Sequence, residues 1–170
     1  MTEYKEVILD NLTKFVDNIL KDKEKTKAKM IRGLRSRARN SPTLFNIYGY
    51  YGFFSFLLYK SESIEHLYNS YIFVRDILNG KNVGLNENTS DKEGYSLYMV
   101  LLLYLLFSLK NKESELEKIF INKDSVDLAK LVENLKNEKN FFEKSMKDYN
   151  LLVYMKQILS LIPSKSDENE

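Results

Sequence analysis

The stretch IRGLRSRARNSPTLFNIYGYYGFFSFLLYK, residues 31–60, decides how the chain folds because it joins two segments of opposite character. Four of the chain's five arginines lie within residues 32–39, and the next twenty residues, 40–59, contain no charged side chain. Arginine favours solvent or phosphate, whereas an uncharged aliphatic and aromatic run favours burial. The first segment is therefore expected at the surface and the second in the core.

Within the basic segment, charged and apolar side chains separate onto two faces of a helix. At 100° per residue, Met30, Leu34 and Ala38 lie opposite a stripe of basic residues. The stripe consists of Lys21, Lys25, Lys29, Arg32, Arg35 and Arg39. It is about 27 Å long at about 1.5 Å per residue. Because apolar residues begin only at Met30, residues 21–27 are expected to be a solvated linker or a frayed turn.

The sequence also predicts a helix boundary inside this stretch. Ser41 and Pro42 are typical of the N-cap and first position of a helix, where a proline loses no hydrogen bond. The basic helix is therefore expected to end at residues 39–40. In the uncharged helix that follows, Gly49 and Gly52 are expected to bend the chain or to admit a close neighbour. A helix that is apolar all round is expected to be central and buried.

Apolar residues at three- and four-residue spacing predict further helices before and after this stretch. One covers residues 4–20, and another covers residues 63–78 and ends at the Asn-Gly pair that follows it, a typical left-handed stop. Residues 80–94 lack this spacing and are expected to form a mobile surface loop. Residues 95–109 are strongly apolar but shorter than the roughly 20 residues of a membrane span, so they predict a buried helix.

The last third of the chain is also expected to be helical. A short helical turn is predicted to end near Ile121, and a final helical region with a break at residues 137–140 is predicted to run to Pro163. Residues 164–170 have nothing to bury and are expected to be a disordered tail. No stretch shows the alternation of a half-buried strand. The predicted fold is therefore all-α, a single helical domain of residues 1–163 with about five to seven helices.

Composition narrows the classes of function. The chain has no cysteine and a single histidine, His66, which is interpreted as a structural or surface residue. It has neither a phosphate-binding loop nor a dinucleotide-binding glycine motif, and its closely spaced glutamates are interpreted as solvated helix faces. We therefore expect no enzyme activity, no cofactor and no metal. The lack of cysteine and of a signal peptide favours the cytoplasm, and no membrane association is expected.

The positive charge is local. Residues 21–39 contain nine basic and two acidic residues, a net charge of +7, whereas the whole chain sums to +2. The stripe has no paired amide side chains of the kind that read bases, so it predicts phosphate-backbone contacts without sequence preference. A helix face that only improves solubility is the alternative. The aromatic residues of segment 45–59 are assigned to the core, with base stacking or a protein contact as alternatives.

Residues 36–61 resemble the small α-helical subunit of type III-B CRISPR-Cas effector complexes, the Cmr family. The family pattern has basic residues, a small residue and proline, an apolar stretch, Asn-Gly-Leu, and a helix that ends in Phe-Leu and lysine. The residues that match without gaps are Arg37, Arg39, Pro42, Gly49, Phe56, Leu57 and Lys60. Tyr48 and Tyr50 depart from the asparagine and the leucine. With residues 149–163, which are similar to the closing helix, the resemblance covers about a quarter of the chain.

This resemblance implies a non-catalytic protein of antiviral defence, present in several copies beside the backbone and large subunits of the complex. Its basic face would line the groove where a guide RNA pairs with a target RNA, and it would contact phosphates only, since base pairing supplies the sequence specificity. The expected RNA-binding residues are Lys25, Lys29, Arg32, Arg35, Arg37, Arg39 and Lys60.

Three other functions stay open at this point. The first is a free-standing helical regulator that binds nucleic acid, although the helix after Pro42 lacks the polar side chains of a recognition helix. The second is the small subunit of a type I-A or type III-A complex. The third is a scaffold whose arginines bind acidic protein partners. The RNA-binding hypothesis depends on one structural expectation, that the cationic groups of the stripe point away from the interior.

Overall fold

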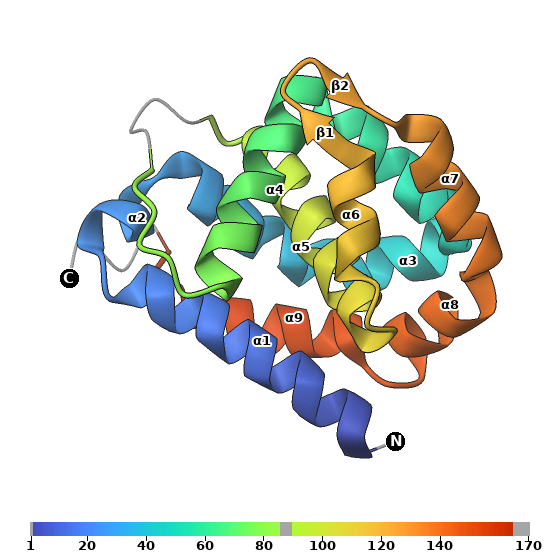
Figure 1. Cartoon of the computed structure of the whole chain (residues 1–170). Helices are drawn as coiled ribbons and strands as arrows, with labels where there is room; N and C mark the ends of the chain where they lie inside the picture. The colour runs from blue at the N-terminus through green and yellow to red at the C-terminus, as the bar shows by residue number, and fades with distance from the viewer. Residues whose placement is uncertain (1, 86–89, 165–170) are drawn as a thin grey trace.

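The computed structural model describes residues 2–85 and 90–164, which form nine α-helices and one short antiparallel β-hairpin (Figure 1). The elements are α1 (Thr2–Leu20), α2 (Lys23–Lys27), α3 (Lys29–Ser61), α4 (Ile64–Leu78), α5 (Glu93–Leu109), α6 (Glu113–Ile119), β1 (Phe120–Asn122), β2 (Ser125–Val126), α7 (Leu128–Asn137), α8 (Lys139–Lys147) and α9 (Leu151–Leu159). The predicted all-α class is confirmed. The described part of the chain has more helices than the five to seven expected, partly because Asn150, at φ 60°, separates α8 from α9.

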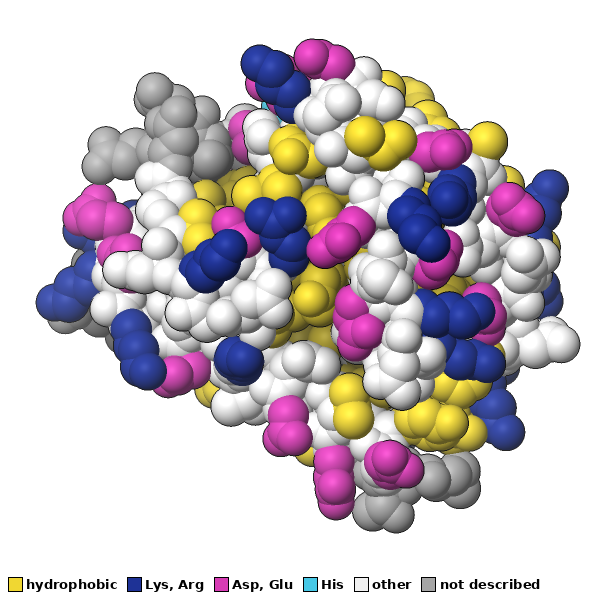
Figure 2. Space-filling model, viewed as in Figure 1, with side chains coloured by type: hydrophobic (Ala, Val, Ile, Leu, Met, Phe, Trp, Pro, Cys, Tyr) yellow, Lys and Arg dark blue, Asp and Glu magenta, His cyan; other side chains and the backbone are white. Residues whose placement is uncertain are grey.

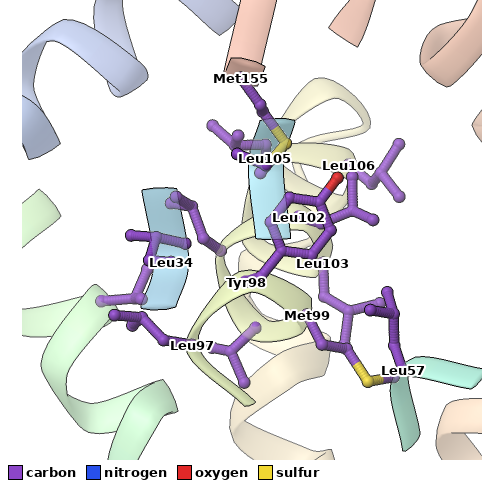
Figure 3. Close-up of a cluster of buried hydrophobic side chains, with 14 of the residues drawn as sticks. Leu34, Leu57, Leu97, Tyr98, Met99, Leu102, Leu103, Leu105, Leu106 and Met155 are labelled. Atoms are coloured by element: carbon purple, nitrogen blue, oxygen red, sulfur yellow. The ribbon is translucent and has the colours of Figure 1, made fainter. Parts of the chain in front are cut away.

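The central helix is α5, which lies behind α4 and α6 in Figure 1. Fourteen of its residues are buried, as its sequence predicted. Its leucines and Tyr98 pack against Leu34 and Leu57 of α3 and against Met155 of α9 (Figure 3). In the described ranges, no helix combines the length and the apolar character that a bilayer span requires.

α3 crosses α5 at a contact between two glycines. A Cβ atom on Gly94 would lie 2.6 Å from the carbonyl carbon of Gly33, and one on Gly33 would lie 2.6 Å from the carbonyl oxygen of Asp91. Because side-chain atoms do not approach backbone so closely, glycine at both positions allows the two helices to touch. The crossing places Asp91 and the first turn of α5 against the arginine-rich half of α3.

The predicted helix boundary at Ser41 and Pro42 is wrong, because α3 continues through both residues. Pro42 has no N–H to donate to the carbonyl of Ala38, four residues earlier, which normally ends a helix. The Ser41 hydroxyl donates to that carbonyl at 2.9 Å instead. Since the carbonyl keeps a hydrogen-bond partner, the helix tolerates its proline.

α3 breaks at Gly49, where the sequence allowed a bend. The backbone there has φ 72° and ψ −176°, a combination open essentially to glycine alone. Beyond the break, Phe53 and Phe54 enter the core, whereas Tyr48 just before the break and Tyr51 just after it stay about half exposed. The uncharged segment is therefore buried on one face only, and not all round as predicted.

Several other predicted boundaries are confirmed. α4 ends at the predicted left-handed stop, where Gly80 has φ 81° and the Lys81 N–H donates to the Asp76 carbonyl at 2.8 Å. The break between α7 and α8 falls within the predicted residues 137–140. The hairpin of β1 and β2 was not predicted. Residues 86–89 of the predicted loop, and residues 165–170 of the predicted tail, lie outside the described residues.

Figure 2 shows the face formed by α1, α4 and α6. Lysine and arginine side chains alternate there with acidic ones, around a hollow between α4 and α6 whose floor is hydrophobic. Charged pairs include Arg75 with Asp76 at 3.0 Å and Lys118 with Glu115 at 3.2 Å. Because the two signs are interspersed here, the local positive excess has to be sought elsewhere, along α3.

Candidate nucleic-acid interface

The seven predicted RNA-binding residues lie in three places and not along one stripe. Lys29, Arg32, Arg35 and Arg39 lie together near the C-terminal end of α9. Arg37 and Lys60 lie beside aromatic rings of α3 and α5. Lys25, a residue of α2, is buried against Asn18 of α1.

The largest group of cations surrounds two adjoining hollows of about 370 and 280 Å³. We call the two hollows and the cations around them the basic hollow. Its cations are Lys29, Arg32, Arg35 and Arg39 from α3 and Lys156 from α9. Lys29, Arg39 and Lys156 are exposed, and Arg32 and Arg35 are half-buried. The site thus offers several cationic side chains around a space open to solvent.

Arg35 also joins α3 to α9. Its Nε donates to the carbonyl oxygen of Ser160, the C-cap residue of α9, at 3.4 Å. A helix C-terminus carries a partial negative charge, so a guanidinium is favourable there. Arg35 is therefore held in position at the rim of both hollows. Lys156 was missed from the sequence, because nothing in a short apolar repeat indicates that α9 packs beside the arginines of α3.

Arg37 does not point freely into solvent, which corrects its predicted role. Its Nη2 donates to Oδ2 of Asp91 at 2.9 Å, and its guanidinium carbon lies 3.9 Å from the centre of the Tyr95 ring. Only 19% of the side chain is exposed. The cause is the glycine crossing, which brings Asp91 and the start of α5 to this side of α3. Asp91 also lines the basic hollow, so it lies on the boundary between the two groups of residues.

Lys60 is half-buried beside a row of aromatic rings. We call Tyr48, Phe56, Tyr59 and Tyr95 the aromatic row. Tyr48 stacks on Phe56 with ring centres 5.3 Å apart, and Phe56 meets the edge of Tyr95 at 6.0 Å. The Lys60 ammonium lies 5.8 to 5.9 Å from the rings of Phe56, Tyr59 and Tyr95, within the range of cation–π attraction.

Lys25 is withdrawn from solvent, so its predicted phosphate contact is wrong for this conformation. The Asp22 carboxylate caps α2 by accepting the Glu24 N–H at 3.0 Å. The short helix that follows turns Lys25 inward, where its Nζ donates to Oδ1 of Asn18 at 2.9 Å and its exposure falls to 1%. The solvated linker or frayed turn expected at residues 21–27 is a short helix, α2, whose buried residue is Lys25 and whose Lys23, Glu24 and Lys27 are exposed.

A separate hollow of about 390 Å³ contains the single histidine. His66 lies there with Glu93, whose Oε1 is 3.9 Å from its Nε2, and with Glu65, Asn69 and several apolar residues. Its backbone N–H donates to the Ser63 hydroxyl at 3.0 Å, which caps α4. Within the described part of the chain, no group of three or more potential metal ligands comes together.

Comparison of the chain with protein-family models, with curated proteins and with solved structures found no match.

Proposed function

We propose that the chain is a non-catalytic RNA-binding subunit of an RNA-guided effector complex, and that it holds RNA by its phosphates at the basic hollow. The basic hollow is the observation that carries this proposal, because cations of two helices surround two adjoining hollows there. Arginine at the rim suits phosphate, since its planar fork donates two hydrogen bonds at once. Contacts of this kind fix an RNA strand without reading its bases.

The resemblance of residues 36–61 supports the finer proposal, a small subunit of a type III-B complex. There the chain would lie in several copies beside the backbone subunits, next to the guide and target RNA. Arg39 belongs both to that resemblance and to the basic hollow. Arg37 belongs to the resemblance, but its pairing with Asp91 leaves it a smaller part in phosphate binding.

Salt dependence of RNA binding tests the phosphate contacts. The variant Lys29→Gln/Arg39→Gln/Lys156→Gln removes three exposed cations of the basic hollow and leaves the anchored Arg35 in place. Each phosphate contact with single-stranded RNA adds about 0.7 to the slope of log affinity against log salt. We therefore expect the variant to bind an oligouridylate more weakly, with a slope shallower by up to about 2.

The matched control is Lys118→Gln/Lys123→Gln/Lys136→Gln, which removes three exposed lysines of α6, the hairpin and α7 that line neither hollow. It changes the net charge equally and should affect the slope much less. Equal effects of the two triple variants would show that only overall charge matters, and would refute a localised phosphate site.

The variant Asp91→Asn tests the same site with an expected change in RNA affinity of the opposite direction. Asp91 places a negative charge at the rim of the basic hollow and occupies Arg37. The amide removes the charge at nearly constant shape, so RNA binding should tighten severalfold. Asp124→Asn, an exposed site on the hairpin, changes the net charge equally and should have a smaller effect. A weaker or unchanged affinity of Asp91→Asn would contradict the assigned site.

The assembly itself requires a separate measurement. A tagged chain purified from its native host should bring down companion subunits and short RNAs, and ribonuclease treatment should reduce the RNA but leave the protein contacts. Recovery of the chain alone, without RNA or companions, would refute the effector-complex proposal even if the purified protein binds RNA.

A further inference from the structure

We infer that the aromatic row is a stacking site for unpaired bases, so that the chain binds single-stranded RNA in preference to duplex. This inference rests on the proposed function, because it names the kind of RNA that the basic hollow would hold. It concerns Tyr48 and Tyr59, whose exposed fractions are 49% and 78%, and the two cations beside the row, Lys60 and Arg37.

The rings are presented in a way that leaves flat surfaces for a ligand. Gly52 lies between Tyr48 and Phe56 along the helix, and a Cβ there would lie 3.0 Å from the Cβ of Tyr48. Since Gly52 has no side chain, the Tyr48 ring can lie along the helix and stack on Phe56, with an angle of 19° between the rings. One face of Tyr48 is thus covered, and half of the side chain remains open to solvent.

Lys60 supplies a positive charge beside Phe56, Tyr59 and Tyr95 that can attract a polyanion. Residues 40–59 contain no acidic side chain, and Lys60 follows directly. At the other end of the row, the guanidinium of Arg37 lies against the Tyr95 ring and pairs with Asp91, so it contributes less positive charge than Lys60. A strand with a phosphate near Lys60 can place its bases on the tyrosines, and base–aromatic stacking is indifferent to sequence.

The aromatic row adjoins the basic hollow. Arg37 lies against Tyr95 of the row, and its partner Asp91 lines the hollow. One strand can therefore lie with its phosphates at the hollow and its next bases on the row. The bases of a duplex are stacked on one another and cannot reach the rings, so the inference distinguishes single strands from duplexes.

The test compares two probes of equal charge, an oligouridylate and an abasic ribose-phosphate oligomer of the same length. The variant Tyr48→Leu/Tyr59→Leu keeps an apolar side chain but removes the rings. We expect it to bind oligouridylate about fivefold or more weakly for each tyrosine, with binding of the abasic probe unchanged. Tyr51→Leu is the matched control, because Tyr51 is 50% exposed on the same helix but makes no ring contact with the row. It should bind both probes as the wild type does.

Photocrosslinking detects directly whether a base lies against Tyr48 or Tyr59. Tyrosines that only stabilise the fold would give no such crosslink. With 5-iodouridine in the oligomer, irradiation should link the RNA to Tyr48 or Tyr59, as mapped by mass spectrometry of the digested complex. Crosslinks confined to other residues would overturn the inference. So would an equal loss of affinity for both probes, or a double variant that binds RNA normally but has a lower sedimentation mass, which would identify the row as a contact between protein chains.

The outcomes also separate this inference from the proposed function. If the basic-hollow variant loses affinity while the tyrosine variant does not, the stacking site is wrong and the phosphate site stands. If the wild-type chain binds neither probe at any salt concentration, the proposed function fails as well.

Discussion

A single hydroxyl allows the longest helix of this fold to pass through a proline. Ser41 is 1% exposed, and its hydroxyl occupies the carbonyl of Ala38 that Pro42 cannot reach. In the variant Ser41→Ala that buried carbonyl loses its partner, at a cost of about 1–3 kcal/mol in the free energy of unfolding. In a Pro42→Ala background the backbone N–H is restored, so the same change should cost much less.

Urea unfolding of the four proteins in this double-mutant cycle measures the difference. We expect a coupling of about 1 kcal/mol or more between the two positions. If Ser41→Ala costs the same with and without the proline, the hydroxyl has some other role than replacing the missing hydrogen bond.

Individual charges of the candidate site were the hardest feature to predict from the sequence. The helical wheel placed Lys29, Arg35 and Arg39 on one face, and these do lie together. It could not show that Asp91, 54 residues away, pairs with Arg37, or that a short capped helix turns Lys25 inward. A wheel treats every position of a face as solvent, whereas a neighbouring element decides which of them remain exposed.

At the scale of the element, contact between α3 and α5 depends on two small residues. Gly94 is in the first turn of α5, where alanine would by itself favour the helix by about 1 kcal/mol. Its methyl group would overlap the backbone of Gly33, however, and force the helices apart. We expect Gly94→Ala to lower the free energy of unfolding by about 1–3 kcal/mol despite the better propensity.

Thermal and urea unfolding of Gly94→Ala, beside Gly84→Ala, measure this effect. Gly84 is exposed and its added methyl would meet no heavy atom within 4 Å, so its substitution should be close to neutral. A Gly94→Ala variant as stable as the wild type would show that the helices separate without cost.

Helix boundaries were predictable where a local signal decides them and not where a side chain replaces a backbone contact. Gly80 ends α4 by adopting a left-handed backbone conformation, which glycine does readily. The Asn-Gly pair in the sequence predicts this stop without any knowledge of the rest of the fold. Pro42 carries an equally strong local signal, yet Ser41 cancels it. The hairpin of β1 and β2 has only five residues in its strands, too few for a visible alternation.

At the scale of the whole molecule, buried tyrosines join parts of the fold that lie far apart in the sequence. Tyr50 of α3 donates its hydroxyl to the carbonyl of Leu135 in α7 at 2.7 Å. Tyr98 of α5 is fully buried and meets Phe53 of α3 with ring centres 6.4 Å apart, and Tyr71 of α4 stacks on Phe120 of the hairpin at 4.8 Å. Burial raises the pKa of all three phenols. The fold therefore favours their neutral forms and is expected to lose stability in strong alkali.

Tyr71 allows the size and the sign of this effect to be tested. Burial above all, with a smaller contribution from Glu117, raises its pKa from 10.0 to about 12. The folded chain thus holds this proton more tightly than the unfolded chain. The resulting stability is complete below pH 10 and is lost as the pH rises to about 12. Tyr71→Phe has no phenolic proton to lose. Between pH 10 and pH 12 the free energy of unfolding of the wild type should therefore fall by up to about 2 kcal/mol more than that of the variant. Urea unfolding from pH 8 to pH 12 measures the difference, and a constant difference across that range would mean that the Tyr71 phenol ionises as easily in the folded chain as in the unfolded one.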